Sequence, residues 1–177
     1  FANVEVRQLP DDEIAGFDRI HFGQDWGYAL DPLHWVKLHY DATRETIYIF
    51  DEFRAHKMQN KELAKALLDG KRMAATDLLI ADSAEPKSIA DMNEYGVRTI
   101  GAEKGADSVR YSIRWLQNRA KIVIDPARCP YTMQEFTGYE YEQTKDGEFI
   151  SKYPDRNNHA IDAVRYALNL VWRQRGK

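Results

Sequence analysis

The chain has a single cysteine among its 177 residues, Cys129, so an intrachain disulfide and a cysteine zinc cluster are excluded. No apolar run approaches the roughly 18 residues of a membrane-spanning helix, and we therefore expect no membrane segment. The formal net charge is only −3, so any contact with nucleic acid has to come from a local basic patch. The first residues, 1–4, contain neither an initiator methionine nor the regions of a signal peptide, and we interpret the chain as a piece of something longer.

The composition is that of a folded protein. Hydrophobic residues make up 44% of the chain and charged residues 30%, which argues against intrinsic disorder. The length predicts one compact domain over residues 1–177, large enough for a real core, in which residues 1–18 form a lead-in segment.

The hydrophobic pattern changes along the chain. Apolar alternation and β-branched residues first predict three antiparallel strands, at 19–26, 35–40 and 46–53, with a hairpin turn at 41–45. Helices and strands then alternate, with Asn60 as the expected cap of the first helix. The further expected elements are helices at 60–70, 86–96, 107–116, 131–136 and 158–173, strands at 77–82, 97–100 and 121–124, and a hairpin at 139–150. This order predicts an α/β fold, a mixed sheet with helices on both faces that matches the ribonuclease H-like fold.

Four residues are candidates for a metal site. Asp25 and Asp82 each end a short apolar strand, and strands that are neighbours in the sheet would present both carboxylates at one edge. Asp162 lies in the first turns of the last helix, and His159, three residues earlier, shares its helix face. Oxygen ligands with one imidazole suit Mg²⁺ or Mn²⁺ better than zinc. Two such ions can cleave a phosphodiester, and we expect Asp25, central in the sheet, to bridge them.

Each candidate also has a purely structural interpretation. A strand-terminal aspartate such as Asp25 or Asp82 is often a turn or capping residue. Asp162 could interact only with the helix dipole, and His159 could be a capping or packing histidine. Their joint placement on one topology favours the metal site.

Other charged residues have weaker functional interpretations. We expect Glu85 on the surface, and Asp51 and Glu52 on an exposed edge. Lys104, Arg110 and Arg114 could hold DNA phosphates, since the two arginines share a helix face, although a solvated basic face is the alternative. Arg119 and Lys121 extend this basic stretch, and the hairpin around residues 145–152 could regulate access to the site.

Three segments resemble the C-terminal nuclease domain of tailed-phage large terminases, especially those of headful-packaging Bacillus phages. They are residues 22–27 (FGQDWG), 80–86 (IADSAEP) and 157–167 (NNHAIDAVRYA). The similarity extends from about residue 17 over nearly the whole chain. The resemblance implies that Asp25, Asp82 and Asp162 bind Mn²⁺ or Mg²⁺, that His159 is the active-site histidine, and that the domain cuts DNA during genome packaging.

The resemblance also sets the expected partners. A packaging nuclease acts on double-stranded DNA in the host cell cytoplasm, with a small terminase subunit and a portal protein as partners of the full-length subunit. A complete large subunit also carries an ATPase, but the chain has no G-x-x-x-x-G-K-[ST] loop, because residues 101–105 lack both its spacing and its Lys-Ser/Thr pair. We therefore expect an isolated nuclease domain without the motor.

Two other functions remain open from the sequence. A Holliday-junction resolvase or a transposase-like nuclease would use the same fold and the same acids. A non-catalytic docking domain would use the acids only to hold the fold together.

Overall fold

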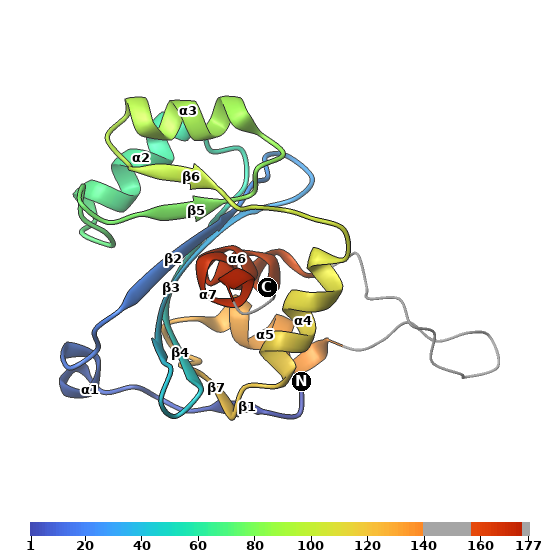
Figure 1. The fold of residues 1–177 in the computed structure, drawn as a ribbon. Helices are drawn as coiled ribbons and strands as arrows, with labels where there is room; N and C mark the ends of the chain where they lie inside the picture. The colour runs from blue at the N-terminus through green and yellow to red at the C-terminus, as the bar shows by residue number, and fades with distance from the viewer. Residues whose placement is uncertain (140–156, 175–177) are drawn as a thin grey trace.

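The computed structural model describes residues 1–139 and 157–174, and its framework is a mixed seven-stranded sheet in the order β1-β7-β4-β3-β2-β5-β6 (Figure 1). The strands are β1 (Val4–Val6), β2 (Ile20–Asp25), β3 (Leu33–Asp41), β4 (Thr46–Ala55), β5 (Leu79–Ala81), β6 (Thr99–Gly101) and β7 (Lys121–Ile124). The helices are α1 (Asp11–Ala15), α2 (Asn60–Asp69), α3 (Pro86–Glu94), α4 (Ser108–Gln117), α5 (Pro130–Gly138), α6 (His159–Ala167) and α7 (Asn169–Gln174).

The predicted topology is confirmed. β2, β3 and β4 pair antiparallel in series, and the turn between β3 and β4 is closed by Asp41, whose Oδ1 accepts a hydrogen bond from the Arg44 backbone N at 3.1 Å. β5 joins β2 in parallel, β6 joins β5, and β7 joins β4. The sheet is therefore the expected ribonuclease H-like arrangement of three antiparallel strands followed by parallel ones.

Helices cover both faces of the sheet, because alternate residues of the central strands point to opposite sides. Val36 and Leu38 of β3 pack in one apolar cluster with residues of α4, α5, α6 and α7. Trp35, between them in sequence, packs in a second cluster with Phe22 and with residues of α2 and α3. Figure 1 shows α6 lying against β2 and β3, with α2 and α3 on the far side of the strands.

A single glycine sets how closely α6 approaches the sheet. A Cβ at Gly23, in the middle of β2, would lie 1.9 Å from the carbonyl oxygen of Ala163 and 2.7 Å from the backbone N of Ala167. Both helix residues are alanines one turn apart, so the face of α6 toward β2 carries only methyl groups at the contact. Helix backbone therefore rests almost directly on strand backbone at this point.

Three local expectations differ from the structure. Part of the lead-in segment joins the sheet, since Val4 in β1 pairs in parallel with Ile122 in β7. The last helix is divided at Leu168, whose φ of −100° and ψ of 10° separate α6 from α7. Asn60 is not a cap: it is the first residue of α2, and its side-chain amide donates to Ser88 and Asp91 of α3 instead.

Two further expectations concern the limits of the fold. Most of the hairpin predicted at 139–150 lies outside the described residues. Among residues 1–139 and 157–174, none of the helices combines the length and the apolar character needed to span a bilayer.

The close contact at Gly23 predicts a large effect for the smallest possible substitution. Gly23→Ala should lower the free energy of unfolding by about 1–3 kcal/mol, because the added methyl group must displace the backbone of α6. Chemical denaturation followed by circular dichroism measures this loss.

Gly138→Ala is the matched control, since a Cβ at that helical position would meet nothing within 4 Å. The control should be neutral or slightly stabilising, as alanine is the better helix former. Equal stabilities for the two variants would show that α6 does not depend on the missing side chain at Gly23.

Candidate active site

Asp25 and Asp82 lie side by side at one edge of the sheet. The parallel pairing of Gln24 with Ala81 brings the carboxyl ends of β2 and β5 together, and the Asp82 backbone N donates to the Gln24 carbonyl at 3.1 Å. The Trp26 indole Nε1 donates to the Asp82 carbonyl at 2.9 Å and fastens the two strand ends to each other. Asp25 is 8% exposed, so its carboxylate is buried at this edge.

Helix α6 adds the other two candidates to the same edge. Its contact with Gly23 directs its first turn toward the end of β2. His159, the first helical residue, has Nδ1 at 3.2 Å from Oδ2 of Asp25, across 134 positions of sequence. Asp162, one turn later, is close enough to Asp25 that the two carboxylates repel each other.

These side chains line an open pocket of about 570 Å³. Its wall is formed by residues from β2, the loop after it, the end of β4 and the start of α6, among them Asp25, Asp31, Arg54, His56, His159 and Asp162. Asp82 does not line this pocket but lies next to it, behind the Trp26 that does. The structure thus brings three of the four sequence candidates into one cavity and the fourth to its border.

Each of the three aspartates has a basic partner from the protein itself. Asp25 meets His159, Lys104 Nζ lies 2.5 Å from Oδ1 of Asp82, and Arg165 Nη1 lies 2.7 Å from Oδ1 of Asp162. Within the described residues, no three His, Cys, Asp or Glu side chains are gathered closely enough to form a ready metal-binding group. The acids therefore share one edge, but each is held by its own basic partner.

Burial and mutual repulsion shift the acid–base behaviour of the site. The pKa of Asp162 is raised to about 6, mainly by burial and in smaller part by the neighbouring Asp25 and Glu135, against the opposing effect of Arg165. Burial likewise raises the pKa of Asp25, although its hydrogen bond with His159 lowers it in part. That same hydrogen bond raises the pKa of His159. A cation placed among these groups would relieve a charge arrangement that is unfavourable without one.

Of the three weaker acidic candidates, one lies where we expected it and two do not. Glu85 is exposed at the start of α3, as expected. Asp51 and Glu52 are not on an exposed edge, and that expectation was wrong. Asp51 pairs with Arg72 at 2.6 Å, and Glu52 is only 8% exposed because its carboxylate binds the start of α5.

The basic residues between positions 104 and 121 have different surroundings in the structure. Arg110 and Arg114 are exposed on α4, and Lys104 is paired with Asp82 at the site. Arg119 is buried, where it stacks over Trp115 with 4.0 Å between its Cζ and the ring centroid. It is a structural residue and is not available to a surface ligand.

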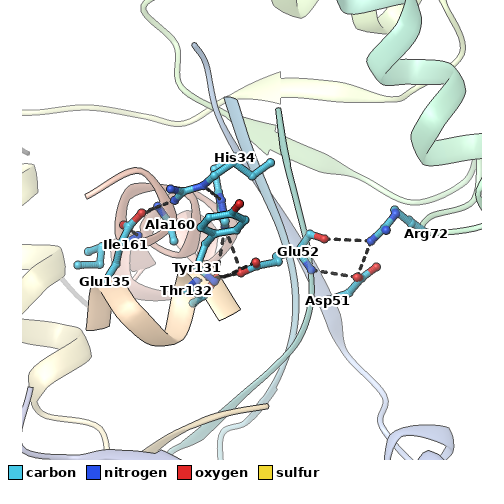
Figure 2. A network of polar contacts seen from close by, with 10 residues as sticks. His34, Asp51, Glu52, Arg72, Tyr131, Thr132, Glu135, Ala160 and Ile161 are labelled. Carbon is cyan, nitrogen blue, oxygen red and sulfur yellow. Dashed lines mark hydrogen bonds and ion pairs between the residues drawn. The ribbon is translucent and has the colours of Figure 1, made fainter. Parts of the chain in front are cut away.

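Two residues that were not predicted from the sequence, Glu135 and Arg54, support the site from behind. Glu135 is 7% exposed in α5 and forms an ion pair with Arg54 of β4. Its other oxygen, Oε1, accepts a hydrogen bond from the Ala160 backbone N at 2.8 Å, in the first turn of α6 (Figure 2). One feature of the sequence could have indicated this role. Glu135 directly precedes the apolar Phe136 in a short helix, and a charged side chain that is buried there needs a partner.

Comparison with known proteins identifies the family of this chain. The family model described as Terminase RNAseH like domain matches residues 25–169. The chain is 41% identical over 180 residues to the large terminase subunit of Bacillus phage SPP1, covering 99% of this chain and 42% of that protein. The chain belongs to this terminase family. It is also 28% identical over 176 residues to the PBSX phage terminase large subunit of Bacillus subtilis, covering 93% of this chain and 40% of that protein.

Solved structures of terminase nuclease domains share the fold. The nuclease domain of the SPP1 large terminase, crystallised with bound Mn, superposes with a TM-score of 0.89 at 40% identity, covering 100% of this chain and 98% of that one. The nuclease of phage G20c, crystallised with bound magnesium, has a TM-score of 0.59 at 11% identity, covering 85% of this chain and 82% of that one, and supports the fold alone. The chain spans about two fifths of the length of the curated relatives it matches.

The raised pKa of Asp162 predicts a pH-dependent stability for the terminase domain. The carboxyl group of Asp162 binds its proton more tightly in the folded protein than in the unfolded chain. Its contribution to the free energy of unfolding is therefore fully present below pH 3.8 and is lost as the pH rises through about 6. In the presence of chelator, Asp162→Asn should therefore be more stable than the native protein at pH 8, by on the order of 2 kcal/mol.

Thermal unfolding at pH 4.5 and pH 8 measures the difference. The stability gain of Asp162→Asn over the native protein should be smaller at pH 4.5 than at pH 8. The exposed Asp69→Asn should show no change of its stability difference with pH. A stability gain of the same size at both pH values would contradict the electrostatic origin.

Proposed function

We propose that this domain is a metal-dependent endonuclease that cuts double-stranded viral DNA during genome packaging, with little sequence preference. The observation that carries the proposal is the meeting of Asp25, His159 and Asp162 in one pocket, with Asp82 at its border. The bound Mn in the related SPP1 nuclease domain supports a divalent cation as the cofactor.

The donor set fits Mn²⁺ or Mg²⁺. Three carboxylates with one imidazole are ligands that these ions accept, and the repulsion between Asp25 and Asp162 is relieved by positive charge between them. We assign Asp25, Asp82 and Asp162 as ligands, with His159 as a further ligand or as the group that holds Asp25. When bound, a pair of ions supplies an activated water and stabilises the leaving 3′ oxygen.

The chain's own residues then orient the carboxylates. Arg165 bonds Oδ1 of Asp162 and is itself fixed by the Ser112 hydroxyl at 2.6 Å, so the aspartate side chain has a defined direction. His159 restrains Oδ2 of Asp25 in the same way. Lys104 holds Asp82 from the solvent side, and metal binding requires this exposed ion pair to open, at a cost of about 1 kcal/mol or less.

DNA contacts are assigned to three exposed basic residues. Lys104 at the site and Arg110 and Arg114 on α4 are assigned to DNA phosphates, which would make binding salt-sensitive and independent of sequence. In the longer protein, the domain would work in the host cytoplasm with an ATPase motor, a small terminase subunit and a portal protein.

A nicking assay on supercoiled plasmid tests the proposed activity. The protein should nick DNA with Mn²⁺ or Mg²⁺ and be inactive with chelator. Asp25→Asn should lower the rate at least about 100-fold, because metal stabilisation of the transition state is worth several kcal/mol. Asp69→Asn is the control, because Asp69 is an exposed carboxylate at the end of α2. This variant should nick DNA as the native protein does.

Three outcomes would argue against this assignment. Activity that survives chelator would exclude the metal mechanism, and inactivity under every condition would favour a docking role. A strong preference for four-way junctions over linear duplex would instead indicate a resolvase.

Metal binding has a readout that does not need DNA. Mn²⁺ at 100 times its dissociation constant should stabilise the native protein by about 2.7 kcal/mol. The melting temperature should then rise by roughly 5–10 °C, and the rise should be absent in Asp162→Asn. An equal rise in both proteins would place the ion elsewhere.

A further inference from the structure

Two buried glutamates each cap the N-terminus of a helix to which they do not belong: Glu52 of β4 caps α5, and Glu135 of α5 caps α6. Glu52 of β4 reaches the start of α5, where its Oε2 accepts from the Tyr131 backbone N at 3.0 Å. Its Oε1 accepts from the Thr132 backbone N at 2.9 Å and from the Thr132 hydroxyl at 2.8 Å (Figure 2). The first free N–H groups of α5 are thus satisfied from the middle of the sheet.

Glu135 repeats this arrangement one helix later. From α5 its Oε1 accepts from the backbone N of Ala160 at 2.8 Å and of Ile161 at 3.3 Å. These two amides lie between His159 and Asp162, the two site residues of α6. The residue before α6, Asn158, makes no capping hydrogen bond with its own side chain, so Glu135 is the side-chain cap that this helix has among the described residues.

Arg54 fixes the position of the Glu135 carboxylate. Its Nη2 forms an ion pair with Oε2 of Glu135, and its Nε donates to His34 Nδ1 at 2.9 Å. Its guanidinium also stacks on Tyr131, with 4.6 Å between Cζ and the ring centroid. A side chain held at three points has little rotamer freedom, so Glu135 receives a defined direction toward α6.

We propose that Glu135 is a positioning residue of the active site: by binding the first amides of α6 it places His159 and Asp162 against Asp25. Glu52 has the same role one step earlier, because it fixes α5, which carries Glu135. This positioning role rests on the nuclease function proposed above.

Stability alone does not account for a charge at this place. Glu135 adds a fourth carboxylate behind three others, and its charge disfavours the ionised forms of Asp25 and Asp162. A buried ion pair such as Glu135–Arg54 is also seldom more stable than an apolar pair of similar volume. What the carboxylate provides, and an apolar side chain does not, is an acceptor directed at the two amides.

Two double variants separate positioning from charge. Both replace the ion pair by neutral groups, Arg54→Met with Glu135→Gln in one and Arg54→Met with Glu135→Leu in the other. Gln keeps an oxygen acceptor for the α6 amides, and Leu does not. Since both carry the same change at Arg54, which lines the pocket, they differ only in the cap.

The Leu variant should bind Mn²⁺ about 10- to 100-fold more weakly than the Gln variant, the usual size of an outer-shell effect, and should nick plasmid correspondingly more slowly. Mn²⁺ affinity is measured with the metal alone by electron paramagnetic resonance. Hydrogen exchange should show that the Ala160 and Ile161 amides lose protection in the Leu variant and keep it in the Gln variant. Glu94→Gln, an exposed glutamate on α3, should match the native protein throughout.

Equal Mn²⁺ affinity and equal amide protection in the two double variants would overturn the positioning role. A native protein that neither binds Mn²⁺ nor nicks DNA would defeat the proposed function, while amide protection would still decide whether Glu135 orders α6. If the Leu variant does not fold, Glu135→Asp takes its place. Its carboxylate is one methylene shorter, and it should show the same loss of affinity and protection.

Discussion

The contact between α6 and β2 at Gly23 is the constraint on which the rest of the site depends. The two elements are separated by more than 130 positions of sequence, and they meet at backbone distance because Gly23, Ala163 and Ala167 leave no bulk between them. A helix held this closely cannot rotate or slide without a steric clash, so the direction of its first turn is fixed relative to the end of β2. Asp25 is two residues beyond Gly23, and His159 is one turn before Ala163. The geometry that joins these two side chains therefore comes from the packing of small residues and not from their own attraction.

Packing that brings the aspartates together also makes their negative charges repel each other, and the chain reduces this repulsion by giving each aspartate a basic partner. Each site aspartate is paired with one basic side chain: a histidine whose pKa the pairing raises, a lysine exposed to solvent, or a buried arginine. These three pairs differ in how readily they open. The lysine can leave Asp82 at little cost, whereas Arg165 is held by Ser112 and stays with Asp162. Each carboxylate of the terminase domain is thus paired within the protein itself, and the proposed metal site would need only the exposed pair at Asp82 to open.

The sequence was most informative where a feature depends on local pattern. The three antiparallel strands, the strand-end positions of Asp25 and Asp82, and the helix face shared by His159 and Asp162 all follow from periodicity over a few residues. The edge strand β1 was not predicted, because three residues with weak alternation become a strand only by pairing with β7, more than 100 positions later. Glu52 was assigned to an exposed edge because the sequence does not show that the start of α5, about 80 positions later, covers it. In each case the deciding contact is with an element that lies far away in the chain.

The same limit explains why Glu135 and Arg54 could not be found from the sequence. A helix cap is usually sought in the residue just before the helix, and α6 has Asn158 there, a residue type that often caps. Its side chain does not cap α6, and the acceptor comes instead from α5. A cap from the helix's own chain would satisfy the amides but would move with the helix. A cap from a neighbouring helix, itself held by a strand of the sheet, ties the first turn of α6 to the rigid framework. For the proposed site, in which His159 and Asp162 lie beside Asp25, this external attachment fixes the position of the helix as well as its stability.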